Sequence, residues 1–514
     1  MVYAFFGSFA GQNQIVKQET DSFLKYQAEK VKDQIDENPY FKLVGKIADE
    51  FGIEIYVIGG FVRDLVLKRQ SKDADFVTIG DCIALAEAVA KQLGPDSDFG
   101  YFKNFGTAQV KHKDWILEFV SARKESYSSD SRKPAVESGT LEDDQNRRDL
   151  SINALAISLN KKTFGEWLDP FNGLEDLRNM TIKTPLEPEI TFSDDPLRMM
   201  RAIRFAAQLE FDIEANTFES LGKMKDRLSI ISKERISDEL NKIILCKKPS
   251  YGFKLLYYSG LLGVILPEMV ELAGVENRDG KAHKDNFFHT LEVLDNVAER
   301  SNDLWLRWAA ILHDIAKPLT KRFSPKDGWT FHGHEERGAR MVPKLFARLK
   351  LPLNEHMRFV EKLVRLHLRP ISLTNEAVTD SAVRRLMFEA GQDLEALMIL
   401  CRADVTTKNP NKARRYLQNF DKVEEKMVIV EETDRMRTFQ PLLTGEQIME
   451  IFNLKPSREV GAIKEEIREA ILEGVIKNTL PECLFLSLQI AAKLGIQPSQ
   501  NFDGEAFILN AEGS

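Results

Sequence analysis

The chain has 514 residues, 43% hydrophobic and 29% charged, with a formal net charge of −8. This length exceeds what one hydrophobic core organises, so we expect several domains in series. No stretch approaches the roughly 20 consecutive apolar residues of a membrane helix, and the apolar patch within 1–14 lacks a preceding Lys or Arg, so we expect neither a membrane partner nor a signal peptide. Widely spaced cysteines exclude a disulfide framework or zinc knuckle and favour a reducing cytoplasm: Cys82, Cys246, Cys401 and Cys483.

The first part of the chain alternates between helical and strand patterns. Residues 1–36 are polar and are interpreted as an N-terminal extension, whereas 37–172 predict a small α+β domain with a mixed sheet. A β-branched strand stopped by two glycines leads directly into a helix. The predicted helices are 41–51 and 61–68, and the predicted strands are 53–58, 74–79, 106–112 and 115–120.

From Asp194 onward helical periodicity replaces the strand patterns, so we expect the remainder to be all α. Turn-forming sequences at 169–173, 274–280 and 409–410 indicate domain boundaries. We therefore expect a helical neck and body over 173–280, another helical domain over 281–410 and a C-terminal helical region over 411–514. The predicted helices are 196–209, 233–245, 251–259, 290–300 and 304–317.

Gly59-Gly60 lies between a predicted strand and a predicted helix. Glycines allow close approach of a ligand, and the amides at a helix start favour an anion, so this junction suits a phosphate group. A Gly-Gly pair by itself is more often an ordinary turn. The aspartates about ten residues downstream strengthen the phosphate interpretation.

Asp73 and Asp75 are two residues apart on a predicted strand and therefore face the same side. Neighbouring carboxylates repel each other, and hard oxygen ligands favour Mg²⁺. Two such ions can activate an attacking hydroxyl and neutralise a leaving pyrophosphate. Glu118 on a later strand is a candidate third carboxylate. The alternative is a solvated strand face, which the glycine pair disfavours.

Five motifs in order resemble the nucleotidyltransferase superfamily and, within it, the class II (bacterial-type) tRNA nucleotidyltransferases and poly(A) polymerases. The resemblance implies an α+β nucleotidyltransferase head followed by an all-α neck and body. It further implies addition of CCA to tRNA 3′ ends from CTP and ATP, with release of pyrophosphate. The matching segments are 59–64, 73–75, 147–156 and 195–206, with Glu234, Arg235 and Glu239.

The family's protein template is an acidic residue followed three positions later by arginine, which corresponds here to Asp195 and Arg198. Residues three apart on a helix are neighbours, so both side chains can meet one base edge. Cytosine and adenine each present an amino donor beside a ring-nitrogen acceptor, which suits carboxylate plus guanidinium. Guanine and uracil present the reverse pattern. The alternative is an ordinary ion pair between Asp194 and Arg198 at i,i+4.

Arginine clusters offer a local basic surface despite the negative net charge, and such a surface is what phosphate contact requires. The resemblance places nucleotide contacts on the glycine pair and on residues of the later motifs. It also identifies 123–139, which includes Arg132 and Lys133, with the family's flexible loop, whose presence accompanies addition of the terminal A. The predicted nucleotide-binding residues are Gly59, Gly60, Arg63, Arg147, Arg148, Asp149, Asn153, Asp195, Arg198, Arg201 and Arg204.

A scattered histidine and aspartate set in 281–410 resembles the HD phosphohydrolase superfamily. The His313-Asp314 dipeptide falls within an apolar helical pattern, where unpaired polar groups are costly. Imidazole with carboxylate suits a divalent transition metal such as Mn, Ni, Co, Fe or Zn more than Mg²⁺. The resemblance implies one metal site at His289, His313, Asp314 and Asp404 and a second at His334 and His367, with His332 as an alternative to His334.

Other functions are compatible with these motifs. A poly(A) polymerase shares the head motifs, although those relatives usually lack the HD set, and enzymes that add only CC or only A share them as well. A different class is an HD phosphohydrolase whose head merely binds RNA. The intact aspartates at 73 and 75 and the Asp195 and Arg198 pair disfavour that reading. His112, His283 and His356 are interpreted as ordinary structural or surface residues.

Overall fold

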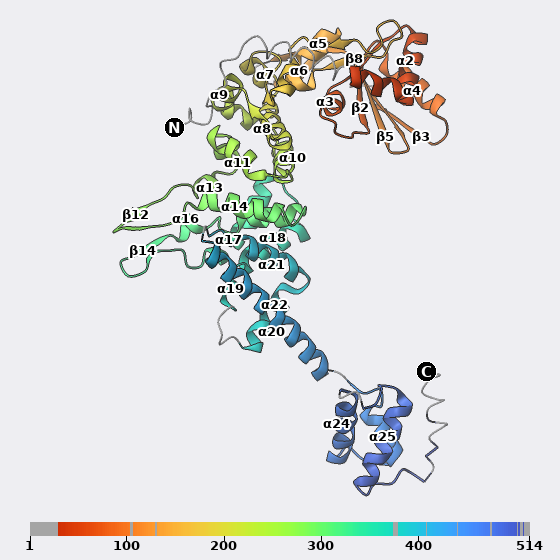
Figure 1. Ribbon diagram of the computed structural model, residues 1–514, viewed down its shortest axis with the longest axis vertical. Coiled ribbons are helices and arrows are strands. Elements are labelled where there is room, and N and C mark those ends of the chain that lie inside the picture. The colour runs from red at the N-terminus through yellow and green to blue at the C-terminus, as the bar shows by residue number, and fades with distance from the viewer. Residues whose placement is uncertain are drawn as a thin grey trace. The chain divides into compact units, whose positions relative to one another are not determined.

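The chain divides into two compact units, the first formed by 1–368 with 392–409 and the second by 369–391 with 410–514. The break expected at 409–410 falls at this division. Residues 29–37 are helical, and the rest of the expected N-terminal extension lies outside the described residues. The computed structural model (Figure 1) describes residues 29–102, 106–128, 131–373, 379–407, 409–438, 440–472, 475–500, 502–503 and 507.

The head contains a seven-stranded sheet in the order β3-β4-β5-β2-β1-β8-β9. Strands β2 and β5 are parallel, and every other adjacent pair is antiparallel, so the predicted mixed sheet is confirmed. The strands are β1 (Glu54–Ile58), β2 (Asp73–Ile79), β3 (Ser97–Phe102), β4 (Thr107–His112), β5 (Trp115–Ser121), β8 (Ala156–Ser158) and β9 (Trp167–Leu168).

Helices cover this sheet and begin at the capping residues that the sequence provides. Asn38 caps α2 (Pro39–Phe51), and Asp81 caps α4 (Cys82–Leu93), which packs on β3 and β4. The core between them includes Phe41, Phe76 and Phe119. The expected flexible loop is an antiparallel hairpin of β6 (Arg123–Ser128) and β7 (Ser131–Ser138), and the side chains of Arg132 and Lys133 lie outside the described residues. The head is completed by α3 (Gly60–Val66), α5 (Leu141–Asn146) and the 3-10 helix η3 (Ser151–Asn153).

A helical neck and body follow the head. The strands β10 (Thr181–Ile182) and β11 (Asp212–Ile213) form a short parallel pair within it. Helix α8 packs on α10 and α11, and its buried side includes Met199, Met200 and Ile203. The helices are α6 (Gly173–Arg178), α7 (Pro188–Asp194), α8 (Leu197–Leu209), α9 (Ala215–Met224), α10 (Lys233–Ile244), α11 (Pro249–Tyr258), α12 (Leu261–Ile265) and α13 (Pro267–Val270), with the 3-10 helix η4 (Lys225–Ile230).

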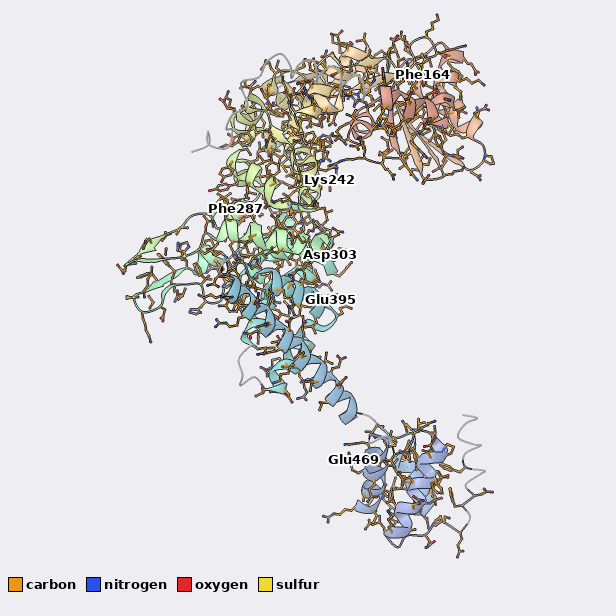
Figure 2. All side chains as sticks on the ribbon, in the orientation of Figure 1. Phe164, Lys242, Phe287, Asp303, Glu395 and Glu469 are labelled. Atoms are coloured by element: carbon orange, nitrogen blue, oxygen red, sulfur yellow. The ribbon has the colours of Figure 1, made fainter. Side chains whose placement is uncertain are left out.

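The next helices form the remainder of the first unit. Phe287 of α14 packs against Tyr257 of α11 with ring centroids 4.6 Å apart, which joins this region to the neck (Figure 2). Helices α17 and α18 pack together, and α15 packs on α14 and α18. The helices are α14 (Asn286–Ala298), α15 (Leu304–Leu312), α16 (Lys317–Thr320), α17 (His334–Leu349), α18 (Glu355–Leu366) and α21 (Leu394–Ala403).

One expectation for this region is wrong. The predicted helix 304–317 ends at Leu312, and residues 313–316 form a turn before α16. Pro318 in the first turn of α16 explains the break, because proline lacks an N–H and clashes with the preceding helical turn. The remainder is mostly helical, as predicted, and it also contains two small hairpins: β12 (Asn277–Arg278) with β13 (Lys281–Ala282), and β14 (Arg322–Ser324) with β15 (Gly328–Thr330).

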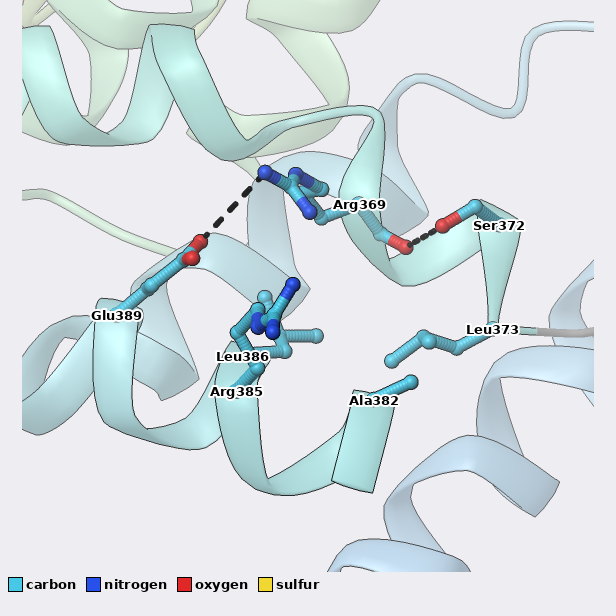
Figure 3. Close-up of a pocket in the computed structure, with 7 residues that line it drawn as sticks. All are labelled: Arg369, Ser372, Leu373, Ala382, Arg385, Leu386 and Glu389. Carbon is cyan, nitrogen blue, oxygen red and sulfur yellow. Dashed lines mark hydrogen bonds and ion pairs between the residues drawn. The ribbon is translucent and has the colours of Figure 1, made fainter. Parts of the chain in front are cut away.

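The second unit is helical throughout its described residues. Its C-terminal helices enclose a core that includes Ile448, Ile451, Ile463 and Ile467. A small pocket elsewhere in this unit is lined by residues of α19 and α20, among them Arg369 and Glu389, whose charged groups lie 3.9 Å apart (Figure 3). The helices are α19 (Arg369–Ser372), α20 (Asp380–Ala390), α22 (Pro410–Thr438), α23 (Gly445–Phe452), α24 (Arg458–Leu472) and α25 (Leu480–Lys493). Among the described residues of both units, no helix has the length and apolar character that crossing a membrane requires.

Candidate functional site

The acidic residues predicted from strand alternation lie together on one face of the head sheet. Asp73 and Asp75 are two residues apart on β2, and Asp75 pairs with Glu118 of the parallel strand β5. Burial and repulsion from Glu118 raise the pKa of Asp73. Burial also raises the pKa of Asp75 to about 6, with Glu118 and Asp73 adding to the shift and Arg148 opposing it. The three carboxylates therefore form one cluster that favours a cation.

Gly59 lies next to this acidic cluster. Its φ is 83°, in the region that favours glycine, and a Cβ there would lie 2.8 Å from Arg148 Nη1 and 3.5 Å from Asp75 Oδ2. Any larger residue would therefore displace Arg148 and contact Asp75. On the other side, Gln109 of β4 donates a 2.6 Å hydrogen bond to Glu118. The glycine expected to lie beside a phosphate thus lies directly beside the acidic cluster.

Arg147 and Arg148 share one buried counter-ion, Asp144, which the sequence reasoning did not identify. Arg147 Nε donates to Asp144 Oδ1 at 3.0 Å, and Arg148 Nε donates to Asp144 Oδ2 at 3.2 Å. Burial raises the pKa of Asp144, but the two guanidinium groups prevail and lower it. The spacing of three and four residues on a helix is the signal that would have indicated this contact. Asp144 therefore orients both arginines, of which Arg148 lies beside Asp75.

A chain of hydrogen bonds joins the head to the neck through four predicted nucleotide contacts. Arg63 Nη1 donates to Asn153 Oδ1 at 2.8 Å, and Asn153 Nδ2 donates to Asp149 Oδ1 at 3.1 Å. Arg201 of α8 then donates through Nε to Asp149 Oδ2 at 2.6 Å. The structure therefore brings together residues that lie far apart in the sequence, from Arg63 to Arg201.

Three of the predicted arginines surround one aromatic ring, that of Phe205. The guanidinium carbons of Arg204, Arg63 and Arg201 lie 3.9, 4.9 and 5.5 Å from the ring centroid. Arg204 also lies 2.5 Å from Glu239 of α10, which in turn contacts Lys242 (Figure 2). The sequence analysis did not identify Phe205, and its place beside Arg204 on α8 is the signal that could have indicated it. The Phe205 ring therefore brings three guanidinium groups together.

The predicted template pair has a geometry that differs from expectation. Asp195 does not lie on α8 with Arg198, because it caps the C-terminal end of α7 with φ −138° and ψ 102°. Pro196 restricts the preceding residue to this extended conformation and so separates Asp195 from the helix. The two residues remain in one turn, since the Arg198 backbone N–H donates to the Asp195 carbonyl at 2.9 Å.

Side chains around the end of α7 hold this pair. Asp195 Oδ2 accepts from Arg235 at 3.4 Å, and Arg198 Nη1 donates to the Thr191 carbonyl at 3.2 Å. Arg198 Nη1 also lies 3.9 Å from Asp194 Oδ2, so the alternative ion pair is present as well. It is not a surface contact, because the Arg198 side chain is only 9% exposed. The ion pair of Arg198 with Asp194 is therefore compatible with the predicted role of Arg198 in base selection.

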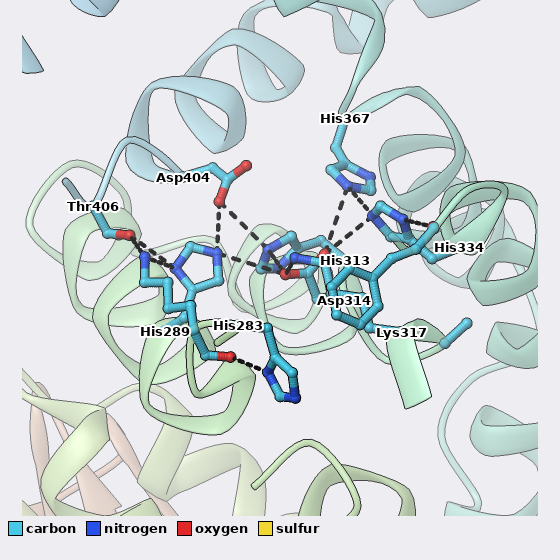
Figure 4. A network of polar contacts seen from close by, with 12 residues as sticks. His283, His289, His313, Asp314, Lys317, His334, His367, Asp404 and Thr406 are labelled. Carbon is cyan, nitrogen blue, oxygen red and sulfur yellow. Dashed lines mark hydrogen bonds and ion pairs between the residues drawn. The ribbon is translucent and has the colours of Figure 1, made fainter. Parts of the chain in front are cut away.

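The predicted histidine and aspartate set forms one buried cluster (Figure 4). Donor atoms of His289, His313 and Asp404 all lie within 4.8 Å of one another. The His289 Nε2 atom is 2.9 Å from Asp404 Oδ1 and 3.5 Å from Asp314 Oδ2. These residues come from α14, from the turn after α15 and from the end of α21.

A second group adjoins the first. Donor atoms of Asp314, His334 and His367 also lie within 4.8 Å of one another, and His334 Nε2 is 3.2 Å from Asp314 Oδ1. Asp314 therefore contacts both groups. Lys317 lies 2.5 Å from Asp314 Oδ2. The turn that replaces the expected helix at 313–316 presents His313 and Asp314 to the two groups together.

Electrostatics within this cluster favour positive charge on His313 and disfavour it on His367. Burial lowers the pKa of His313, but Asp314 and Asp404 outweigh it and raise that pKa to about 10. Burial lowers the pKa of His367 to about 4. Burial raises the pKa of Asp404, yet hydrogen bonds with His289 and His313 lower it overall. The carboxylate charge that favours a proton on His313 equally suits a metal cation bound by the imidazoles.

The remaining histidines lie outside the cluster. His332, which was the alternative to His334 as a metal ligand, is exposed, whereas His334 lies in the cluster. Tyr40 contacts His112 Nδ1 at 2.8 Å, and His356 stacks on Trp305 with ring centroids 4.8 Å apart. His283 Nε2 accepts from a backbone N–H at 3.2 Å. The described contacts of these side chains match their interpretation as structural or surface residues.

Three regions of the chain match known protein families. Residues 55–183 match the family described as Poly A polymerase head domain, and 210–272 match the probable RNA and SrmB-binding site of polymerase A. Residues 286–409 match the HD domain. The fold and site thus define a nucleotidyltransferase head joined to an HD domain, two kinds of domain that imply the use of divalent metal ions.

Similar proteins extend over most of the chain. It is 30% identical to the CC-adding tRNA nucleotidyltransferase of Thermus thermophilus over 437 residues, which cover 82% of this chain and 90% of that protein. It is 29% identical to the A-adding tRNA nucleotidyltransferase of Deinococcus radiodurans over 438 residues, with 82% and 92% covered. The Multifunctional CCA protein of Dechloromonas aromatica is 35% identical over 307 residues, with 58% and 70% covered.

Solved structures show the same fold. A tRNA nucleotidyltransferase complexed with a primer tRNA and an incoming ATP analog matches with a TM-score of 0.51 at 25% identity, covering 74% of this chain and 99% of that one. A CCA-adding enzyme with ATP matches with a TM-score of 0.55 at 22% identity, with 88% and 94% covered. The chain belongs to the tRNA nucleotidyltransferase and poly(A) polymerase family, and it is a nucleotidyltransferase.

Proposed function

We propose that the chain adds CCA to the 3′ end of tRNA, using CTP and ATP and releasing pyrophosphate. The observation that carries this proposal is the acidic cluster of Asp73, Asp75 and Glu118 beside oriented arginines, in a chain that matches tRNA nucleotidyltransferases over 82% of its length. All four cysteines are free thiols, which supports a reducing cytoplasm as the location.

In the proposed reaction the 3′ hydroxyl oxygen of tRNA attacks the α-phosphorus of the nucleotide. A P–O bond forms there, the bond to the β-phosphate oxygen breaks, and pyrophosphate leaves while the hydroxyl proton passes to solvent. Bound Mg²⁺ would lower the pKa of the attacking hydroxyl and neutralise charge on the leaving group. Asp73 and Asp75 would hold the ions, since burial and neighbouring negative charge raise both pKa values and a bound cation relieves that charge.

The arginines would bind and orient the nucleotide. Arg148 lies beside Asp75, and Arg63, Arg201 and Arg204 gather at Phe205, so their guanidinium groups suit a triphosphate. We assign Arg147, Asp149 and Asn153 to the same nucleotide pocket. Base selection falls to Asp195 and Arg198, each of which is held by contacts around the end of α7.

The test uses purified chain, Mg²⁺ and tRNA substrates that end before the CCA, after one C and after two C residues, each with a single labelled nucleotide. Ordered C, C, A incorporation followed by arrest supports the proposal. Addition of A alone, or of two C residues with no A, assigns one of the partial activities, and long A tracts assign a poly(A) polymerase. Asp75→Asn should be inactive, whereas Asp98→Asn, an exposed carboxylate on β3, should remain active.

A second activity is favoured by the buried HD cluster. His313, His334 and His367 each place Nδ1 2.7 Å from a backbone carbonyl, which leaves Nε2 of each ring toward the cluster. Together with His289, Asp314 and Asp404 they suit divalent transition metals such as Mn, Ni, Co, Fe or Zn. We propose that this site hydrolyses phosphate esters, and a 2′,3′-cyclic phosphate is the probe of choice.

The hydrolysis test compares the wild type with His313→Ala across Mn²⁺, Ni²⁺ and Co²⁺. Cleavage of the cyclic phosphate by the wild type alone supports the HD activity. Equal inactivity of both proteins with every metal overturns it. An HD phosphohydrolase whose head only binds RNA would instead cleave the probe and leave tRNA unextended.

A further inference from the structure

The face of the head sheet that carries the acidic cluster extends to the edge strand β3. Gly100 of β3 lies opposite Gln109 of β4, which lies opposite Glu118 of β5. Glu118 in turn lies opposite Asp75 of β2. Residues paired across neighbouring strands point to the same side of a sheet, so these four positions share one face. The three spacings between β2 and β3 amount to about 14 Å.

The two faces of this part of the sheet differ in what covers them. Helix α4 packs on β3 and β4, on the side to which the buried residues Ala108 and Val110 point. Alternation along β3 directs Phe102 to the other side, together with Gly100. Phe102 is 67% exposed. An exposed aromatic ring therefore lies on the same face of the sheet as the acidic cluster.

Gly100 keeps the surface beside this ring flat. A Cβ added at Gly100 would meet no atom of the described residues within 4 Å, so packing does not require glycine there. Its backbone does not adopt the left-handed conformation that favours glycine either. A glycine inside a strand weakens the strand, and it often marks a place where a ligand approaches the backbone closely. The open face at Gly100 therefore suits a ligand.

The residues that suit a triphosphate lie on the opposite side of the carboxylates. Strand β1 neighbours β2 on one side, and β5 neighbours β2 on the other. Gly59 directly follows β1, and Arg148 lies beside it. In an in-line displacement the attacking oxygen and the leaving pyrophosphate lie on opposite sides of the reacting phosphorus. With the triphosphate on the β1 side, the attacking hydroxyl approaches from the β5 side, toward β4 and β3.

We propose that Phe102 and Gly100 form a stacking platform for an unpaired base near the 3′ end of the RNA acceptor. Bases of single-stranded RNA stack on exposed aromatic rings, and Gly100 lets the RNA lie close to the sheet. Stacking accepts every base, because each has a flat face, and it therefore suits a 3′ end that changes with each addition. The inference rests on the proposed function and identifies the part of the head that holds its RNA substrate.

The test measures kcat and the KM values for tRNA and CTP, with tRNA that ends before the CCA. Phe102→Ala should raise the KM for tRNA at least about 5-fold. Its kcat at saturating tRNA and its KM for CTP should equal those of the wild type, because the platform does not contact the reacting atoms. Phe102→Tyr should match the wild type, since it keeps an aromatic ring.

Gly100→Val tests the flat surface without removing the ring. Valine suits a strand and meets no described atom at this position, so circular dichroism melting should show no loss of stability. The added side chain fills the space beside Phe102, and the KM for tRNA should therefore rise. The dissociation constant of Phe102→Ala for tRNA should exceed that of the wild type by the same factor at low and high salt, because stacking releases no counterions.

Tyr101 provides the matched control on the same strand. It is 55% exposed, but it points to the opposite face and stacks on Phe99 with ring centroids 5.7 Å apart. Tyr101→Ala should keep the wild-type KM for tRNA. An equal rise in Tyr101→Ala would show a general effect of the edge strand and would overturn the platform.

Other outcomes also decide the proposal. A wild-type KM for tRNA in Phe102→Ala or in Gly100→Val overturns the platform while the transferase function stands. A changed oligomeric state in Phe102→Ala, with an unchanged KM for tRNA, assigns this face to contact between copies of the chain and overturns the platform as well. A wild-type protein that does not extend tRNA overturns the proposed function, and the platform with it.

Discussion

Asp149 accepts a hydrogen bond from Arg201 at 2.6 Å, and this contact joins the last part of the head to the longest helix of the neck. Both residues are proposed nucleotide contacts, yet each already has the other as its partner. Asp149 also accepts from Asn153 and is 7% exposed. The pocket is therefore preorganised by the same pair that connects its two walls.

Asp149→Asn should lower the free energy of unfolding by about 2 kcal/mol at pH 7, because it removes a charge-assisted hydrogen bond to Arg201, whose side chain is 35% exposed and therefore partly screened by water. Burial raises the pKa of Asp149, but Arg201 prevails and lowers it below 3.8. A lowered pKa gives stability that is present above the ordinary value and is lost as pH falls below it. Urea unfolding should show a smaller difference in the free energy of unfolding between wild type and Asp149→Asn at pH 3 than at pH 7. An equal difference at both pH values would point to packing instead.

Asp75→Asn should stabilise the metal-free protein at alkaline pH while abolishing transfer. Burial raises the pKa of Asp75 from 3.8 to about 6. A raised pKa gives stability that is full below the ordinary value and is lost as pH rises through 6, so the charged wild type is penalised at pH 8. We expect a gain of about 3 kcal/mol in the free energy of unfolding, measured in urea with EDTA. Mg²⁺ should reduce this difference in stability between the variant and the wild type, because it binds and stabilises the wild type. A less stable variant at pH 8 would contradict this account.

Arg198→Ala should weaken discrimination against UTP and GTP. Each unpaired buried polar group costs about 1 to 3 kcal/mol, which corresponds to about 5- to 150-fold in selectivity. The measurement is kcat/KM for each nucleotide on tRNA lacking CCA. Asp194→Asn is the matched control, because it removes the 3.9 Å ion pair and keeps Arg198. If both variants change selectivity equally, the effect of Arg198 on selectivity arises from its ion pair with Asp194 and not from contact with the base.

Arg307→Met should destabilise the first unit by about 3 to 5 kcal/mol. Arg307 is 1% exposed and donates to the carbonyls of Ile244, Cys246 and Ser301 at 2.8, 2.9 and 3.0 Å. Methionine fills the space but leaves these acceptors unpaired. Calorimetry should show a large fall in Tm. Arg348→Ala, which removes a partly exposed pair with Glu268, should cost less than about 1 kcal/mol.

Several features followed from the sequence because they depend on local periodicity. Strand alternation predicted that Asp73 and Asp75 share a face, and the glycine pair marked the junction of β1 and α3. The failures were also local: Pro196 separates Asp195 from α8, and Pro318 ends the helix that was expected to contain His313. Proline changes a helix boundary without changing the hydrophobic pattern that predicts the helix.

The sequence by itself determined the positions of strands β1, β2, β4 and β5 and the types of residue that carry the chemistry, because these depend on spacing along one chain. Tertiary structure alone decided which side chains become partners. Glu118 meets Asp75 only because β2 and β5 pair in parallel, Phe205 meets Arg63 only where neck and head pack, and Thr406 meets His289 across 117 residues. Such contacts depend on packing between distant segments, and no periodicity within either segment encodes them.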